Sequence, residues 1–228
     1  QDLIANLRHQ LEKLNNYQFT DKEWEHFFKI KIANTNYDIE DKTNIIQEDY
    51  IQLLQREDGS VKNIYLLDKE HIHNNSLQVI NQYVPKGGAF ENRYDVTILV
   101  NGLPLVHVEL KRRGVHIKEA FNQIRRYNRD SFWAGSGLFE YVQIFVISNG
   151  THTKYYSNTT RTSHIAEVTK GSKQKSKNQT SHSFEFTSFW ARRDNQIIPD
   201  LDDFTATFFA KHTLLNILTK YCVFTSEK

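Results

Sequence analysis

The sequence has no methionine, and its 228 residues include only one cysteine and three prolines. A single cysteine, Cys222, cannot form an internal disulfide, so we expect a protein of a reducing compartment, the cytoplasm. No run of 18 apolar residues occurs, which argues against a membrane-spanning helix. The amphipathic start, QDLIANLRHQLEKL, lacks the layout of a signal peptide. Because an initiator methionine is also missing, we expect a fragment of a longer chain.

Charge of either sign is not in excess, since 29 basic and 27 acidic residues leave a net charge of +2. This value is too small to indicate a nucleic-acid-binding protein by itself. A content of 39% hydrophobic and 25% charged residues is typical of a soluble globular protein. Any contact with nucleic acid must therefore come from local basic clusters.

The N-terminal region has the pattern of amphipathic helices. Leucine and isoleucine recur at helical spacing in its first stretch, and Thr20 with Glu23 forms a capping box that predicts the start of a second helix. A third short helix is predicted around Lys42–Tyr50. We expect residues 1–60 to form a helical part that packs on a core made by residues 61–228.

The middle of the chain is rich in strand-type sequence. The turn Asn101-Gly102 predicts a hairpin, and the spacing of apolar residues over Ile117–Asp130 predicts a helix. Alternation of strands and helix indicates an α/β fold, with a mixed central sheet flanked by helices. The predicted strands are Ile64–Leu67, Leu77–Val84, Arg93–Val100, Leu105–Lys111, Tyr141–Ser148 and Phe184–Phe189.

The last third of the chain combines a basic segment with a helical tail. Residues 169–183 contain four lysines and no apolar side chain, which predicts a mobile loop. An apolar stripe from Leu214 to Leu218 predicts a C-terminal helix.

Three charged residues of the predicted hairpin carry the chemistry. Glu109 and Lys111 lie on the same side of their strand, because side chains alternate along a strand. The turn at Asn101-Gly102 brings Asp95 back alongside them. Two carboxylates and one ammonium group are thus expected to meet on one face of the sheet.

Two adjacent carboxylates repel each other unless a cation neutralises them, and Mg²⁺ prefers carboxylate and water oxygens. A metal held in this way polarises a phosphate and activates a bound water. Lys111, as an ammonium, would stabilise charge on the phosphate, and as a neutral amine it would orient or deprotonate the water. The alternative is a surface strand whose Glu–Lys pair contributes well under ~1 kcal/mol. Strongly apolar surroundings place these charges at the edge of a core instead.

Several neighbouring residues can support such a site. Gln123 and Tyr127 share one helical face. The cluster of Arg112, Arg113, Arg125 and Arg126 flanks the site and can follow a phosphate backbone, or it can decorate a solvated helix face.

The remaining histidines and the cysteine carry less of the chemistry. His107 shares the strand face of Glu109 by alternation and would border the site. We interpret His71 and His73 as a solvated loop pair without a third ligand. Cys222 is interpreted as a buried structural residue.

The stretch RYDVTILVNGLPLVHVELKRRGVHIKEAFNQIRRY, at 93–127, resembles the nuclease domain of the R (restriction and motor) subunit of type I restriction–modification enzymes. The resemblance continues through FVISNG at 145–150, NTT at 158–160 and DFTATFFAKHTLLNIL at 203–218, and weakly through NIYLLDK at 63–69. It therefore covers most of the chain.

This resemblance implies a PD-(D/E)xK restriction-endonuclease-like core and a metal-dependent DNA endonuclease activity. It implies that Asp95 and Glu109 are metal ligands, joined by the main-chain carbonyl of Leu110, and that Lys111 is the catalytic lysine. Gln123 and Tyr127 match the family's Q-x-x-x-Y element, which is implicated in DNA handling.

The sequence differs from the family pattern in two respects. Tyr94 stands where the motif name has proline. Many such nucleases add a glutamate from an earlier helix, but none of Glu12, Glu23 and Glu25 matches a family motif.

The resemblance also sets expectations for the whole protein. The chain has no G-x-x-x-x-G-K-[ST] phosphate loop, so the ATP that the full-length enzyme requires would bind to motor domains that this fragment lacks. The implied partners are double-stranded DNA, the methyltransferase and specificity subunits, and the chain's own motor domains. The alternative function is a non-catalytic nucleic-acid-binding or assembly module of the same fold.

Overall fold

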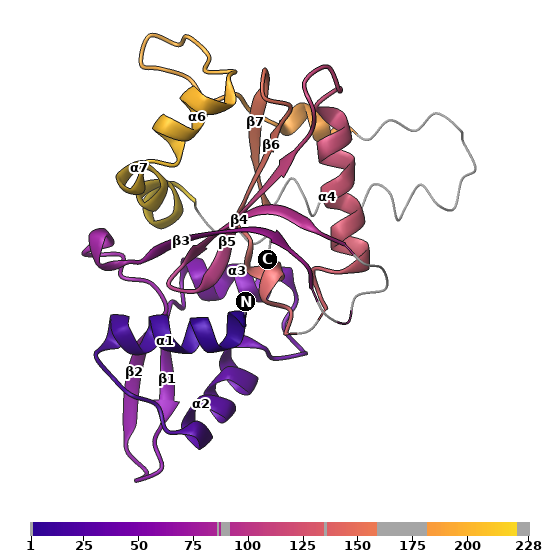
Figure 1. Ribbon diagram of the computed structural model, residues 1–228. Helices are drawn as coiled ribbons and strands as arrows, with labels where there is room; N and C mark the ends of the chain where they lie inside the picture. The colour runs from indigo at the N-terminus through magenta and orange to yellow at the C-terminus, as the bar shows by residue number, and fades with distance from the viewer. Residues whose placement is uncertain (1, 86, 88–91, 135, 159–181, 223–228) are drawn as a thin grey trace.

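The computed structural model describes residues 2–85, 87, 92–134, 136–158 and 182–222. A five-stranded sheet lies at the centre, with helices on both of its faces and a smaller N-terminal region beside it (Figure 1). The molecule is therefore mixed α/β, as the sequence predicts.

The central sheet has the strand order β3-β4-β5-β6-β7. Its strands are β3 (Leu77–Tyr83), β4 (Tyr94–Val100), β5 (Leu103–Leu110), β6 (Ile144–Ser148) and β7 (Thr153–Ser157). Only the pair β5–β6 is parallel, and the other neighbours are antiparallel. Helix α4 (Lys118–Asp130) forms the crossover between β5 and β6, because parallel strands need a long connection. The expected mixed sheet is confirmed.

The β4–β5 hairpin turns at Asn101 and Gly102, as predicted. Both residues have positive φ, +51° and +85°, which suits the tight turns that join twisted strands. A Cβ at position 102 would lie 2.6 Å from the main chain of Leu7, so glycine lets helix α1 (Leu3–Asn15) approach the turn. Asn101 is buried, and its amide donates to the carbonyl of Leu66 at 3.0 Å.

The N-terminal region contains three short helices and a hairpin. Helix α1 is followed by α2 (Asp21–Phe27), the π-helical turn η1 (Phe28–Ile32) and α3 (Ile39–Gln47). Thr20 and Glu23 form the predicted capping box. Strands β1 (Ile51–Gln55) and β2 (Val61–Tyr65) pair antiparallel on either side of the Asp58-Gly59 turn. This hairpin spans the position expected to separate the helical part, 1–60, from the core, 61–228.

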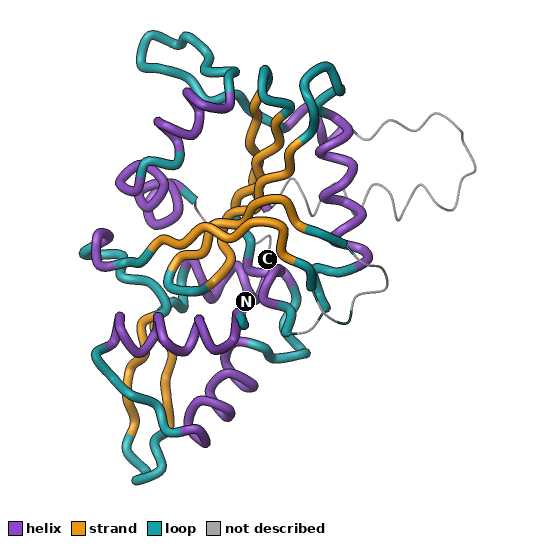
Figure 2. The backbone as a smooth tube through the Cα atoms, viewed as in Figure 1, coloured by secondary structure: helices purple, strands orange, loops and turns teal. Residues whose placement is uncertain are grey.

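The two faces of the sheet are covered by different helices, which Figure 2 draws in purple on either side of the orange strands. On one face Phe121 of α4 packs against Tyr156 and Phe145 stacks on Tyr156. On the other face Tyr155 contacts Phe208 of α6 (Leu201–Phe208) at a ring-centroid distance of 5.0 Å. The short elements are η2 (Ile72–Asn74), η3 (Leu138–Tyr141), α7 (Lys211–Asn216) and η5 (Ile217–Tyr221).

One predicted strand is wrong. The segment Phe184–Phe189 does not form a strand, because η4 (His182–Phe186) is a 3₁₀ helix and only Ser188 makes an isolated bridge, to Tyr155. Of the predicted basic loop, residues 169–181 lie outside the described residues. The described helices include none that is long and apolar enough to cross a membrane.

Candidate active site

The ends of β4 and β5 bring the predicted charged residues together. The register pairs Val96 with Val108 and Thr97 with His107, and one further step of this register sets Asp95 opposite Glu109. The two carboxylates are close, since the charge of Glu109 acts on the pKa of Asp95. Residues opposite each other in an antiparallel pair share a face. Asp95 is half-buried, whereas the Glu109 side chain is fully buried. The two carboxylates thus meet on the face covered by α4.

Asp95 is held by the main chain of the neighbouring strand. Its Oδ2 accepts a hydrogen bond from the amide of Leu110 at 2.9 Å. Burial raises the pKa of Asp95, and the charge of Glu109 adds to this effect, although the Leu110 amide and Lys111 act in the opposite direction. A carboxyl group with a raised pKa next to a second carboxylate is the environment that a bound cation relieves.

Lys111 connects the carboxylates to helix α4. Its Nζ lies 3.0 Å from Oε1 of Glu109 and also donates to the side-chain oxygen of Gln123. The amide of Gln123 donates in turn to the hydroxyl of Tyr127, which donates to the carbonyl of Arg93 at 2.9 Å. A continuous hydrogen-bonded relay thus runs from the end of β5, through α4, to the start of β4.

Tyr127 is an internal member of this relay. Its side chain is only 3% exposed, and the ring packs against Tyr94 at a centroid distance of 5.0 Å. Burial and the charge of Glu109 raise the pKa of the Tyr127 hydroxyl, so it stays a neutral donor. Gln123 is more exposed than Tyr127. Of the predicted DNA-handling pair, only Gln123 is accessible from outside in this structure.

The predicted basic residues differ in exposure, and one of them contacts the site. Arg112 and Arg113 are exposed in the loop after β5, and Arg126 is exposed on α4, while Arg125 is half-buried. One guanidinium nitrogen of Arg126 lies 3.4 Å from the side-chain oxygen of Gln123. Of the four arginines, Arg126 therefore adjoins the relay, and Arg112 and Arg113 follow Lys111 directly in the chain.

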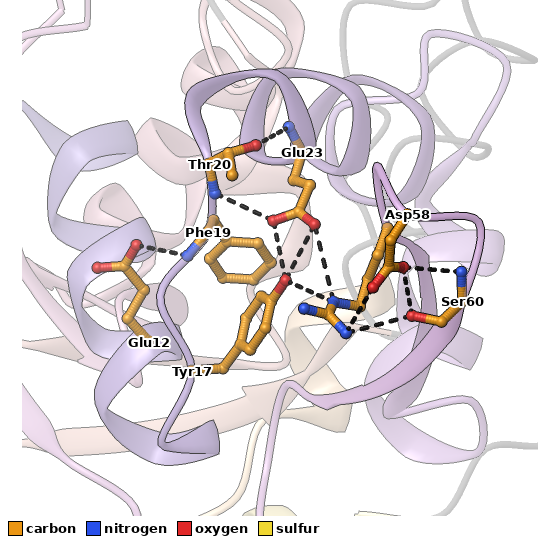
Figure 3. A network of polar contacts seen from close by, with 8 residues as sticks. Glu12, Tyr17, Phe19, Thr20, Glu23, Asp58 and Ser60 are labelled. Carbon is orange, nitrogen blue, oxygen red and sulfur yellow. Dashed lines mark hydrogen bonds and ion pairs between the residues drawn. The ribbon is translucent and has the colours of Figure 1, made fainter.

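The upstream glutamates serve the N-terminal region instead of the site. Figure 3 shows Glu12 directed at the amide of Phe19 and Glu23 directed at Thr20 and Tyr17. Burial raises the pKa of Glu23, but the Thr20 amide and the Tyr17 hydroxyl outweigh it, and the net pKa is lowered. Glu25 is exposed on α2. None of these side chains contacts Asp95 or Glu109 in the described part of the chain.

The remaining histidines and the cysteine have distinct environments. His107 borders the site as predicted, because its Nε2 lies 3.6 Å from Oε2 of Glu109. His73 stacks on His212 of α7 and faces its Nδ1 at 3.2 Å, a partner far away in the sequence that local spacing could not reveal. Burial raises the pKa of the Cys222 thiol to about 11, which keeps it protonated and unreactive.

A large cavity of the protein is separate from this site. A cavity of about 990 Å³ lies on the other side of β6 and β7, next to α3 and α7, and its lining includes Gln143, Tyr155, Trp190 and Phe208. Asp95, Glu109 and Lys111 do not line it. The three charged groups therefore lie outside this cavity, at the ends of β4 and β5.

The site has the donors of a magnesium site with few protein ligands. Among the described residues, no three histidine, cysteine, aspartate or glutamate side chains converge on one point. Asp95 and Glu109 do converge, because the charge of Glu109 contributes to the raised pKa of Asp95. Mg²⁺ is usually bound by one or two carboxylates together with water and substrate phosphates. The donor set therefore fits this cation.

Comparison with known proteins gives a consistent result. Residues 1–164 match the family described as the type I restriction enzyme R protein N terminus. The type I restriction enzyme EcoprrI endonuclease subunit of Escherichia coli is 49% identical over 226 residues, which are 99% of this chain and 66% of that protein.

Two staphylococcal proteins are also similar. The type I restriction enzyme SsaAORF53P endonuclease subunit of Staphylococcus saprophyticus is 37% identical over 220 residues. The SauMSSORF170P endonuclease subunit of Staphylococcus aureus strain MSSA476 is 36% identical over 220 residues. Both alignments cover 96% of this chain, but the chain spans only 20% and 21% of the length of these relatives.

Proposed function

The chain belongs to the family of type I restriction enzyme R protein N-terminal regions, and from this membership and the site geometry we propose that it is a metal-dependent DNA endonuclease domain. The observation that carries the proposal is the meeting of Asp95, Glu109 and Lys111 at the ends of two adjacent strands. We assign the domain a PD-(D/E)xK core, in which Asp95 and the Glu109–Lys111 pair are the named elements of the motif.

The proposed cation ligands are Asp95, Glu109 and the carbonyl of Leu110. A residue in an antiparallel pair turns its N–H and C=O toward the same neighbouring strand. Because the Leu110 amide donates to Asp95, its carbonyl is expected to face the same side. Mg²⁺ bound there would polarise the phosphate and lower the pKa of a water molecule. The raised pKa of Asp95 supports this assignment, since a cation would favour its ionised form.

Lys111 is the proposed electrostatic catalyst. Its ammonium group is fixed by Glu109 and Gln123, so the positive charge is already placed before DNA arrives. A preorganised charge of this kind stabilises the negative charge that develops on a phosphate during hydrolysis. Gln123 and Tyr127 would then act on DNA cleavage by holding Lys111 in position.

The basic cluster of Arg112, Arg113, Arg125 and Arg126 is the proposed contact with double-stranded DNA. Contacts from arginine to phosphate fix the position of a duplex but carry no sequence information. Sequence recognition would therefore come from a specificity subunit, and methylation from a methyltransferase subunit. We propose that the longer protein also carries ATP-dependent motor domains, which would determine when cleavage occurs.

Substitution in the assembled full-length enzyme tests this function. Asp95→Ala and Lys111→Ala should each abolish DNA cleavage but preserve folding and ATP hydrolysis. Lys62→Ala, which changes a half-buried lysine of the N-terminal hairpin, provides a control that should cleave normally. If Asp95→Ala cuts DNA at the normal rate, the active-site assignment is wrong.

The alternative is a module of the same fold that binds nucleic acid without cutting it. The presence of both carboxylates and the lysine in contact argues for catalysis, since a binding module has no need of this costly arrangement. A wild-type complex that translocates DNA but never cleaves it would favour the alternative.

A further inference from the structure

An unusual group of unsatisfied polar atoms includes one oxygen of the Glu109 carboxylate and its neighbours in the hairpin. Four buried side-chain atoms of Thr97, His107 and Glu109 have no hydrogen-bond partner among the described residues. They are the Thr97 hydroxyl, both ring nitrogens of His107, and Oε2 of Glu109. Buried polar groups nearly always have partners, so their concentration at one place needs an explanation.

The three residues form a column on one face of the hairpin. Glu109 and His107 are two positions apart on β5, and Thr97 lies opposite His107 on β4. His107 and Glu109 are both 0% exposed, and Nε2 of His107 is 3.6 Å from Oε2 of Glu109. A shift of a few tenths of an ångström would complete a hydrogen bond between them.

Aromatic rings enclose the imidazole of His107. The rings of Tyr94, Tyr127, Phe132 and Phe145 contact it edge to face, with centroids 5.5 to 6.3 Å away. A phenylalanine at position 107 would satisfy these contacts equally well. Packing therefore explains the need for a ring at this position but does not explain the need for its nitrogens.

We infer that His107 is a positioning residue, which donates a hydrogen bond from Nε2 to Oε2 of Glu109. This bond holds one carboxylate oxygen toward the interior, while Oε1 stays 3.0 Å from Lys111 at the site. Thr97, opposite in the register, is placed to donate its hydroxyl to the second ring nitrogen and so to select the tautomer with the proton on Nε2. The inference rests on the proposed function, in which Glu109 is a ligand of the cation.

Two substitutions in the assembled full-length enzyme separate this role from packing. His107→Gln keeps a donor near the position of Nε2, whereas His107→Phe keeps the ring but has no donor. We expect His107→Phe to lower the cleavage rate about 10- to 100-fold, as is typical when a ligand's hydrogen-bond partner is lost, and to raise the Mg²⁺ concentration needed for half-maximal cleavage. His107→Gln should restore most of the activity, although it fits the aromatic surroundings less well.

A purely structural role for His107 predicts the reverse order, with His107→Phe the more active variant, and that order would overturn the inference. Equal cleavage by His107→Phe and the wild type would overturn it as well. Phe145→Leu disturbs the same aromatic enclosure without removing a polar group, and it should reduce thermal stability but keep cleavage. His107→Met serves as the donor-free variant, with the same expected loss, should His107→Phe not fold. Normal cleavage by Asp95→Asn would instead reject the proposed function itself.

Discussion

Removal of the Tyr127 hydroxyl tests its role in the relay. A role in the relay predicts slower cleavage, whereas a direct contact with DNA predicts weaker DNA binding. Tyr127→Phe removes the hydrogen bond to the Arg93 carbonyl and the one accepted from Gln123, and it keeps the ring. Each bond contributes about 1 kcal/mol net, so we expect the free energy of unfolding to fall by about 1–2 kcal/mol. Gln123 then loses the group that orients its amide toward Lys111. We expect cleavage to slow by about 10- to 100-fold, as for other residues that orient a catalytic group.

The affinity for DNA distinguishes the two interpretations. Because Tyr127 is only 3% exposed, its hydroxyl is inaccessible to a phosphate, and the dissociation constant for DNA should not change. Cleavage kinetics and a binding titration on the same full-length enzyme provide the measurement. Weaker DNA binding with an unchanged rate of cleavage of the bound DNA would refute the relay.

Tyr94→Phe is the matched control for this experiment. Tyr94 is also buried, its ring touches that of Tyr127, and its hydroxyl donates to Ser131 at 2.7 Å. The change removes the same atom from the same aromatic cluster, and it should cost about 1 kcal/mol of stability. It leaves the relay to Lys111 in place, so cleavage should persist. An equal loss of cleavage in both variants would show that the aromatic packing matters and the relay does not.

Two further predictions concern stability. Gly102→Ala should lower the free energy of unfolding, measured by urea denaturation, by about 1–3 kcal/mol more than Gly59→Ala does. Both glycines have positive φ, but of the two only Gly102 would bring a Cβ against the main chain of Leu7. Equal losses of stability would contradict the close approach of α1. The raised pKa of Asp95 means that the folded state binds this proton more tightly than the unfolded state does. Ionisation of Asp95 therefore lowers the free energy of unfolding. This loss is absent below the unfolded-state pKa and complete once the pH has risen through the folded-state pKa. Asp95→Asn should therefore raise the melting temperature at pH 7 but not at pH 3, and Mg²⁺ should raise that of the wild type alone; a variant no more stable at pH 7 would count against the burial of this charge.

The hairpin and its charges could be predicted from the sequence because the signals are local. Asn101-Gly102 fixes the turn, and alternation along the strands then determines which side chains share a face. The same alternation predicted that His107 would lie beside Glu109. The pairing of Asp95 with Glu109 also depends on a β-bulge between Ile98 and Leu99, which local signals did not predict. Without this one-residue shift the turn would pair Asp95 with Val108, and the two carboxylates would lie on opposite faces.

Other features depend on tertiary contacts that no local pattern contains. The segment Phe184–Phe189 has the aromatic content of a strand, but Phe184 packs against Phe121 of α4 and the chain turns as a 3₁₀ helix. The burial of Tyr127 also escaped prediction, because helical spacing shows that it shares a face with Gln123 but not how deep that face lies. The engagement of Glu12 and Glu23 in separate networks is equally invisible in their spacing.

The relay from Lys111 has a consequence for how cutting is restrained. It returns through α4 to the carbonyl of Arg93, one residue before β4, and β4 carries Asp95, which is tied back to β5 by the Leu110 amide. Two strands and a helix thus close a circuit in which each element fixes the next. These hydrogen bonds hold Asp95 and Lys111 in place, so neither side chain needs to move before the site can act. Under the proposed function, cleavage would therefore be controlled by the access of DNA to the site and not by a rearrangement of Asp95, Glu109 or Lys111.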